Sequence, residues 1–349
     1  MAKSEKNRPI EIGDTVIQPG QRANVTLPVA DLYTSTSLGM PVHVVCGKRP
    51  GPVMFVSAAV HGDELNGVEI VRRLLKLKLL KSVRGTLLAV PIVNVHGFLD
   101  QSRYLPDRRD LNRSFPGSAK GSIAARLAHR FSTEIVAKAD YGIDLHTGAI
   151  NRANLPQVRA NIDNRATLDF AKAFGAPVVI DADIRDGSLR GYAAELGMPV
   201  LIYEAGEALR FDEMGIRAGL KGILDVMRHI GMLTPLKKPR NVNSVLARDT
   251  RWVRAPASGI VTNKARLGDR IDEGKRLATI SDPLGDEELH VTAPFDGIVI
   301  GRTNLPLAHE GDALFHLASF KNVPKAEDAV ETFAQEYTAP PVLTAEAKS

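Results

Sequence analysis

Between residue 40 and about residue 235, short apolar runs alternate with amphipathic segments. The runs are rich in β-branched residues and predict strands at residues 52–60, 85–94, 139–146, 176–181 and 198–207. Two segments between them, 66–80 and 122–139, carry apolar residues at steps of three and four and predict helices, with Ser122 as the N-cap of the second. This alternation predicts a layered α/β domain around a largely parallel sheet.

Polar residues that could bind a metal or take part in catalysis lie at the ends of these predicted strands. His61 and Glu64 follow the first run in "HGDE", His146 ends the third run, and Glu204 lies near the end of the last. Ligands of open α/β sheets bind beyond the carboxyl ends of strands. Two imidazoles and a carboxylate suit Zn²⁺ and leave a fourth position for water. The spacing H-x-x-E is weak by itself, because it often arises by chance, but its position favours a metal site.

The C-terminal part of the chain has a different pattern of predicted secondary structure. Residues 237–245 read as a linker, and short strands and turns follow, with a weak repeat of "APASGIV" (255–261) as "APFDGIV" (293–299). Two hairpin-rich halves predict a small barrel or sandwich. From Lys321 the chain is charged and contains Pro340–Pro341, which predicts a mobile tail. We therefore expect a β-rich segment over 1–39, the α/β domain over 40–236, a C-terminal β domain over 246–320 and a flexible tail over 321–349.

Composition and charge narrow the class of protein. The chain is 44% apolar and 24% charged, as in soluble globular proteins, and its net charge of +5 is scattered, which does not favour a nucleic-acid surface. No apolar run approaches the roughly 18 residues of a membrane span, and the N-terminus lacks the apolar region of a signal peptide. The single cysteine, Cys46, excludes an intrachain disulfide and reads as a buried thiol. These features fit a cytoplasmic protein that binds neither nucleic acid nor membrane.

The stretch "RDLNRSFPG" (109–117) can be interpreted in two ways, as a surface loop or as a binding site. Asp110, Asn112 and Arg113 lie between turn signals and could form a solvated loop. Alternatively, the planar guanidinium of Arg113 matches a carboxylate bidentately and Asn112 adds a neutral donor, which would make a carboxylate clamp.

Five motifs in order along residues 50 to about 230 resemble the succinylglutamate desuccinylase/aspartoacylase family, which is related to the zinc carboxypeptidases. They are "HGDE" (61–64), "SRY" (102–104), "DLNRSFPG" (110–117), "DLHTG" (144–148) and "YEAGE" (203–207). The resemblance implies a three-layer α/β/α sandwich around a mixed, largely parallel sheet, followed by a C-terminal β-rich domain. It also implies one zinc ion per chain, held by His61, Glu64 and His146. Asp110 would sit behind His61, and Glu204 would be the general base.

The same resemblance assigns the substrate side of the site. Arg103 would polarise the scissile carbonyl and hold the oxyanion, although Arg108 and Arg109 are rivals for that role. Asn112 and Arg113 would bind a substrate carboxylate.

Several other residues and one repeat near the predicted site have a structural interpretation as well as a functional one. Arg152 and Arg159 follow "DLHTG" and are interpreted as surface charge rather than as readers of a second carboxylate. Asp144 shares a strand face with His146 and either orients it or makes a strand-end hydrogen bond. The C-terminal repeat resembles the biotinyl/lipoyl-like fold, but its hairpin at 281–291 has no carrier lysine. We therefore expect a structural lid or an oligomerisation module that narrows the pocket mouth.

The sequence favours a zinc-dependent hydrolase that cleaves the amide bond of a small N-acylated amino acid. One alternative is a zinc carboxypeptidase acting on peptides. Another is a non-catalytic metal- or ligand-binding protein, against which a base at Glu204 argues. The acyl group, the amine and homo-oligomer formation are left open.

Overall fold

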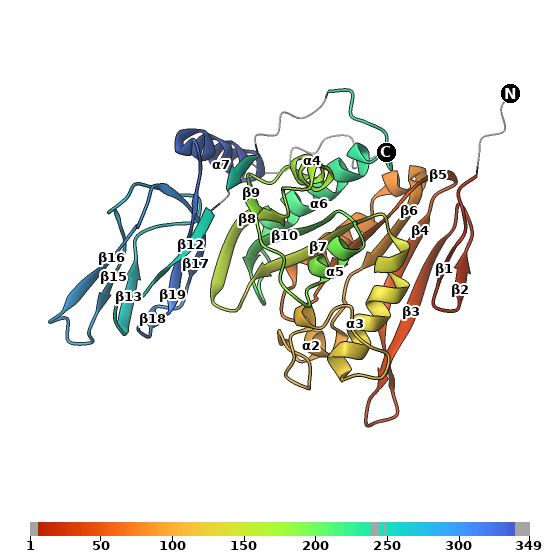
Figure 1. Ribbon diagram of the computed structural model, residues 1–349, viewed down its shortest axis with the longest axis horizontal. Coiled ribbons are helices and arrows are strands. Elements are labelled where there is room, and N and C mark those ends of the chain that lie inside the picture. Colours follow the sequence, from red (N-terminus) through yellow and green to blue (C-terminus); the bar gives the residue numbers. More distant parts are fainter. Residues whose placement is uncertain (1–5, 239–243, 248, 339–349) are drawn as a thin grey trace.

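The computed structural model describes residues 6–238, 244–247 and 249–338, and one large sheet runs through these residues (Figure 1). Thirteen strands of the described residues belong to it, ten of them in one continuous row. In spatial order the row is β12 (Asp249–Arg254), β19 (Ala313–Ser319), β17 (Gly297–Thr303), β8 (Arg152–Ala160), β10 (Val200–Glu207), β7 (Tyr141–Gly148), β5 (Arg49–Ala58), β6 (Arg84–Val90), β4 (Ser37–Cys46) and β3 (Arg22–Asp31). Beside this row, β9 (Val178–Asp181) pairs with β8 and with β11 (Val245–Ala247), and β14 (Arg270–Ile271) pairs with β17.

The sheet is mixed, as expected. Strands β10, β7, β5 and β6 at its centre are parallel to their neighbours within this group. The strands that flank them, β8 on one side and β4 with β3 on the other, pair antiparallel. Parallel neighbours need long crossover connections, and the helices of the chain provide them.

Helices cover both faces of the sheet, which confirms the predicted three-layer sandwich. Successive residues of β5 point to opposite faces: Met54 and Val56 join one apolar cluster, and Phe55 joins another. The first cluster contains residues of α1 (Asn66–Leu75), α4 (Arg165–Phe174) and α6 (Glu213–His229). The second contains residues of α2 (Val95–Leu99), α3 (Ile123–Glu134), α5 (Leu189–Glu195) and the hairpin of β1 (Ile10–Ile12) and β2 (Thr15–Ile17).

The helices begin where the sequence predicts and end earlier. The hydroxyl of Ser122 accepts a hydrogen bond of 3.2 Å from the Ala125 amide and caps α3 as expected. Helix α3 ends at Glu134 and α1 at Leu75, and each is followed by a short 3₁₀ helix. Cys46 is buried in β4, in agreement with the structural interpretation of its thiol.

The C-terminal strands form a sandwich that is fused to the central sheet. A second sheet of β16 (Glu288–Thr292), β15 (Arg276–Ser281), β13 (Gly259–Asn263) and β18 (Leu307–Ala308) faces β12, β17 and β19 across a core that includes Leu277 and Phe315. Strand β17 also pairs with β8, with Gly301 opposite Asn154. In Figure 1 these strands (blue) lie at one end of the long axis, and the N-terminal strands (red) lie at the other.

The prediction of a mobile tail from Lys321 is wrong for most of the segment. Residues 323–338 form helix α7 (Val323–Thr338). Its Ala326, Ala329 and Val330 are buried in a cluster that includes residues of β9 and β17, and Phe333 packs near Ala218 of α6. These apolar positions recur at helical spacing and bury one face of a segment whose other positions are polar. Pro340–Pro341 and residues 239–243 of the expected linker lie outside the described residues.

Within the part of the chain that the structure describes, no helix has both the length and the apolar character needed to cross a membrane.

Candidate metal centre and active site

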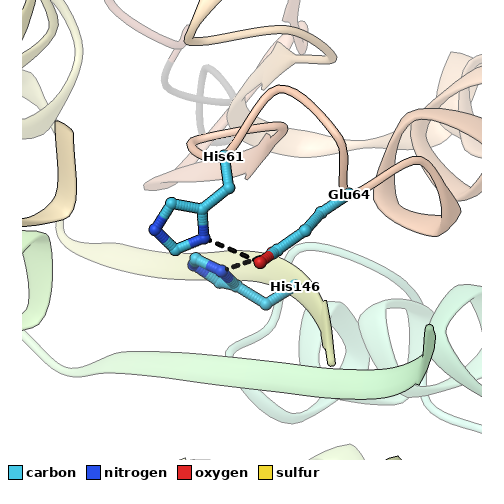
Figure 2. A group of neighbouring side chains, drawn as sticks. All are labelled: His61, Glu64 and His146. Carbon is cyan, nitrogen blue, oxygen red and sulfur yellow. Dashed lines mark hydrogen bonds and ion pairs between the residues drawn. The ribbon is translucent and has the colours of Figure 1, made fainter. Parts of the chain in front are cut away.

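Three buried side chains from different elements converge at the carboxyl ends of β5 and β7 (Figure 2). His61 lies in the turn after β5, Glu64 lies just before α1, and His146 lies near the end of β7. The two Nδ1 atoms lie 2.7 Å from separate oxygens of Glu64, His61 from Oε1 and His146 from Oε2. One ligand atom from each residue lies within 4.8 Å of the others, so the group could hold a metal ion.

The turn that carries His61 depends on close backbone packing. Gly62 follows His61 directly, and a Cβ atom at this position would lie 1.9 Å from the Gly97 carbonyl carbon. Only glycine therefore lets the turn lie against α2. The "HG" of the first motif thus has a packing reason as well as a chemical one.

A carboxylate holds the far side of each imidazole. His61 Nε2 lies 3.1 Å from Asp110 Oδ1, and His146 Nε2 lies 2.7 Å from Asp144 Oδ2. The Ser57 hydroxyl donates to the other oxygen of Asp144 at 2.7 Å. Asp110 thus lies behind His61, where the family resemblance placed it. Both contacts expected as alternatives for Asp144 are present, the one with His146 and a buried hydrogen bond, here from Ser57.

These partners set the charge states of the cluster. Burial lowers the pKa of both histidines, but the nearby carboxylates outweigh it, so the pKa of His61 is raised and that of His146 is raised well above its usual value. Burial raises the pKa of Glu64, and the two histidines outweigh that effect and hold it well below its usual range. The cluster therefore favours positive charge between the carboxylates of Glu64, Asp110 and Asp144.

The donor set fits a divalent cation. An Nε2–H donated to Asp110 or Asp144 leaves the Nδ1 lone pair of that imidazole facing the centre, which is the tautomer that binds metal. Two such nitrogens and a carboxylate oxygen match the three protein ligands of a catalytic zinc site.

Of the three rival arginines, Arg103 lies at the cluster. Its Nη2 donates to Asp110 Oδ2 at 2.9 Å, and its Nη1 lies 3.5 Å from Glu64 Oε1. Arg108 and Arg109 are exposed and do not line the cavity described next.

A cavity of about 440 Å³ opens at the cluster and brings the expected site residues together. Asp110, which lies behind His61, is outside its lining. The expected residues that line it are His61, Glu64, Arg103, Asn112, Arg113, His146 and Glu204.

The loop with Asn112 and Arg113 is held by its own hydrogen bonds. Asp110 Oδ1 accepts from the Asn112 amide at 2.8 Å, and Asn112 Oδ1 accepts from the Leu189 amide at 2.9 Å. The carbonyl of the Asn112 side chain is thus engaged by α5, which leaves its NH₂ group for a ligand. The Arg113 guanidinium donates to the Asn112 carbonyl and is otherwise exposed at the cavity.

Glu204 lies beside the cluster because of strand register. Strand β10 pairs parallel with β7, and Glu204 is opposite His146. Side chains at opposite positions of neighbouring strands share a face, so Glu204 projects into the same cavity as His146. On its other side, Glu204 Oε2 lies 3.0 Å from Arg159 Nε of β8.

Sequence reasoning missed part of the cavity wall. Arg159 is not plain surface charge, because it lines the cavity and pairs with Glu204. Trp252 of β12 and His316 of β19 also line it, and their rings stack with centroids 4.7 Å apart at 4°. Arg152 is exposed, with its guanidinium 5.3 Å from the centre of the Trp252 ring. No local motif marks Trp252 or His316, since only the pairing of β12 with β19 brings them together.

The chain matches known proteins over most of its length. It is 26% identical over 311 residues to the N-alpha-acetyl-L-2,4-diaminobutyric acid deacetylase of Halomonas elongata, which covers 85% of this chain and 91% of that protein. It resembles the product-bound ectoine utilization protein EutE (DoeB) of Ruegeria pomeroyi with a TM-score of 0.79 at 25% identity, covering 90% of this chain and 99% of that one. A succinylglutamate desuccinylase/aspartoacylase structure from Rhodobacter sphaeroides gives a TM-score of 0.76 at 25% identity, covering 86% and 95%.

The family model for the succinylglutamate desuccinylase/aspartoacylase catalytic domain matches residues 50–230, just over half of the chain. This range contains the His61–Glu64–His146 cluster, Glu204 and the Asn112–Arg113 loop. The chain belongs to the succinylglutamate desuccinylase/aspartoacylase family.

Proposed function

We propose that this protein is a zinc-dependent hydrolase that removes the acyl group from an N-acylated amino acid or a similar small amide. The observation that carries the proposal is the convergence, in one cavity, of two histidine Nδ1 atoms and Glu64 with the carboxylate of Glu204 and the guanidinium of Arg113. The named deacetylase activity of the Halomonas elongata relative supports the same reaction class.

The roles of the residues follow from their positions. Bound by His61, Glu64 and His146, zinc would supply a Lewis acid for the amide carbonyl and a water made nucleophilic near neutral pH. Arg113 and the Asn112 amide bind the substrate carboxylate and so fix the scissile bond over the cluster. Arg103 donates hydrogen bonds to the carbonyl oxygen as it gains negative charge.

Glu204 handles the proton in this proposal. Its carboxylate accepts a proton from the attacking water and returns it to the nitrogen of the leaving amine, so that the amide C–N bond breaks as a free amine and a carboxylate form. Its place directly opposite His146 in the strand register supports this role.

The walls of the cavity favour a small substrate over a peptide. Trp252 and His316 close the side built by the C-terminal strands, and the cavity holds about 440 Å³. This is a volume typical of sites for small molecules. The expectation that the C-terminal strands narrow the pocket is part of the same proposal.

Two measurements test it. Purified protein should contain about one zinc ion per chain, and His61→Ala or His146→Ala should lose it, whereas His290→Ala, on the exposed surface of β16, should keep it. Stoichiometric zinc in both cluster variants would rule out the site.

Glu204→Gln should keep the zinc and lower turnover roughly a hundredfold or more. Amine release would be measured over a panel of N-acyl amino acids and short peptides. Turnover of Glu204→Gln at the wild-type rate would remove Glu204 as the base. Faster release of C-terminal residues from peptides than of acyl groups would favour a carboxypeptidase.

A further inference from the structure

One oxygen of Glu204 is held by two hydrogen bonds and one ion pair, all from a single strand, β8. Glu204 Oε2 accepts from Asn154 Nδ2 at 2.9 Å and from Gln157 Nε2 at 3.3 Å, and it lies 3.0 Å from Arg159 Nε. Strand β8 lies on the side of β10 opposite to β7. These donors therefore draw Oε2 away from the strand that carries His146. Among the described residues, no hydrogen bond reaches Oε1.

Asn154 makes the shortest of these contacts, and a C-terminal strand borders it. Gly301 of β17 is opposite Asn154 in the antiparallel pair of β17 and β8. A Cβ atom on Gly301 would lie 3.0 Å from Asn154 Oδ1 and 3.1 Å from the Cβ of His316. Both distances are tighter than ordinary side-chain contacts. The absence of a side chain at Gly301 thus leaves the Asn154 amide room to reach Glu204.

We propose that Asn154 is a positioning residue for Glu204 and that Gly301 of the C-terminal region keeps Asn154 in place. This inference rests on the proposed function, in which Glu204 moves the proton. A carboxylate rotates easily about its last carbon–carbon bond. The Asn154 NH₂ group ties Oε2 to β8, so Oε1 is the oxygen that faces the cavity and exchanges the proton.

The chemistry of the amide suits this task. A neutral donor orients a carboxylate without adding a second full charge beside it, unlike Arg159 on the same oxygen. The C-terminal strands thereby take part in the reaction through Gly301 and Asn154, in addition to bounding the cavity with Trp252 and His316.

Kinetic constants distinguish a residue that positions Glu204 from one that binds the substrate. Asn154→Asp has the same shape, but it cannot donate to Oε2 and adds a negative charge beside it, and we expect its kcat to fall about tenfold or more while KM stays within about twofold. Asn154→Ala should behave similarly and serves if Asn154→Asp does not fold. Asn161→Ala, just after β8 and outside the cavity, is the matched control and should keep the wild-type kcat.

Gly301→Ala tests the role of Gly301, because its added methyl group would lie 3.0 Å from Asn154 Oδ1. The methyl group would also lie 3.1 Å from the Cβ of His316 in the cavity wall, so KM is measured beside kcat to detect a change in the cavity. Gly301→Ala should lower kcat, as the Asn154 variants should. The double variant Gly301→Ala/Asn154→Ala should be no slower than Asn154→Ala alone, because both changes act on one contact. Wild-type kcat in Asn154→Asp and Asn154→Ala would overturn the positioning role, and multiplicative losses in the double variant would overturn the link to Gly301. Both outcomes are distinct from a failure of the proposed function, in which Glu204→Gln itself would keep wild-type turnover.

Discussion

His146 Nε2 lies 2.7 Å from Asp144 Oδ2, and the two residues are separated by a single position on β7. Residues two apart on a strand share a face, so the strand itself delivers both the imidazole and the carboxylate that orients it. Ser57 of the neighbouring strand β5 fixes the second oxygen of Asp144. The direction of the His146 Nδ1 atom is thus set by two adjacent strands before any ion binds.

Removing that orientation should weaken the metal site without removing a ligand. We expect Asp144→Asn and Asp110→Asn each to lower zinc affinity about 10- to 100-fold, because the partner carboxylate fixes the tautomer and the ring. Competition against a chromophoric chelator would measure this. Asp100→Asn, exposed after α2, is the control. Unchanged affinity in both variants would show that the carboxylates do not tune the site.

Arg113→Ala should act on binding rather than on turnover. The guanidinium is exposed at the cavity and offers its fork to a carboxylate, so its loss should raise KM about tenfold or more for substrates with a free carboxylate. Neutral amides of the same acyl group should be unaffected. Arg109→Ala, four residues earlier and outside the cavity, is a matched control. An equal effect on charged and neutral substrates would refute the clamp.

Trp252→Ala should widen the range of substrates. The indole closes one wall of the cavity together with His316, so its removal opens space for larger amine components. We expect kcat/KM for N-acyl dipeptides to rise relative to that for N-acyl amino acids, with Trp252→Phe in between. Steady-state assays with matched acyl groups would measure the ratio. A ratio equal to wild type would show that this wall does not select by size.

His316 should make the fold sensitive to acid. Burial, with a smaller contribution from Arg159, lowers the pKa of His316 to about 3. An unfolded histidine has a pKa near 6.5, so between these values the unfolded chain binds a proton that the folded chain does not. Stability conferred by neutral His316 is therefore present above about pH 6.5 and is lost as the pH falls toward 3.

Urea unfolding of the metal-free protein at pH 7 and pH 4 would test this. Replacing the ring by His316→Asn should reduce the difference between the two pH values by an amount on the order of 3 kcal/mol. The histidines of the cluster are the same in both proteins, so they cancel in this comparison. An equal difference in wild type and variant would show that His316 is not held neutral.

Helix α7 should contribute to stability. Phe333 is 7% exposed and packs near Ala218 of α6, so Phe333→Ala should lower the free energy of unfolding by about 3 kcal/mol. Gln335→Ala, on the exposed side of the same helix, should change it by less than about 0.5 kcal/mol. Chemical denaturation would compare them. Equal stabilities would mean that the helix adds little to the fold.

The sequence predicts the strands and helices whose own hydrophobic pattern is clear. It misses those whose residue types are explained only by contacts with a neighbouring strand. The strand that precedes His61 and the strands that carry His146 and Glu204 are apolar on both faces because helices cover the sheet, and such runs are easy to recognise. Strand β8 was not expected, because Asn154 and Gln157 face polar partners and Pro156 stands among them. Its polarity reflects its contact with Glu204, which no pattern within β8 can reveal.

The same limit explains the other differences. Arg159 reads as surface charge until the pairing of β8 with β10 places it beside Glu204. Trp252 and His316 lie far apart in sequence, and only the register of β12 with β19 makes them neighbours. Helix α7 carries its apolar residues among many charges, so composition suggested a tail where periodicity indicates a helix.

Because β17 is hydrogen-bonded to β8 at residues 152–154, the C-terminal sandwich cannot be treated as a detachable module. A shortened protein that ends near residue 236 would leave this stretch of β8 as an open edge with unpaired amides and carbonyls. Open edges recruit strands from other molecules, so such a fragment is expected to aggregate rather than to serve as a minimal enzyme. Exchange of C-terminal sandwiches between relatives would, for the same reason, require a matching β8.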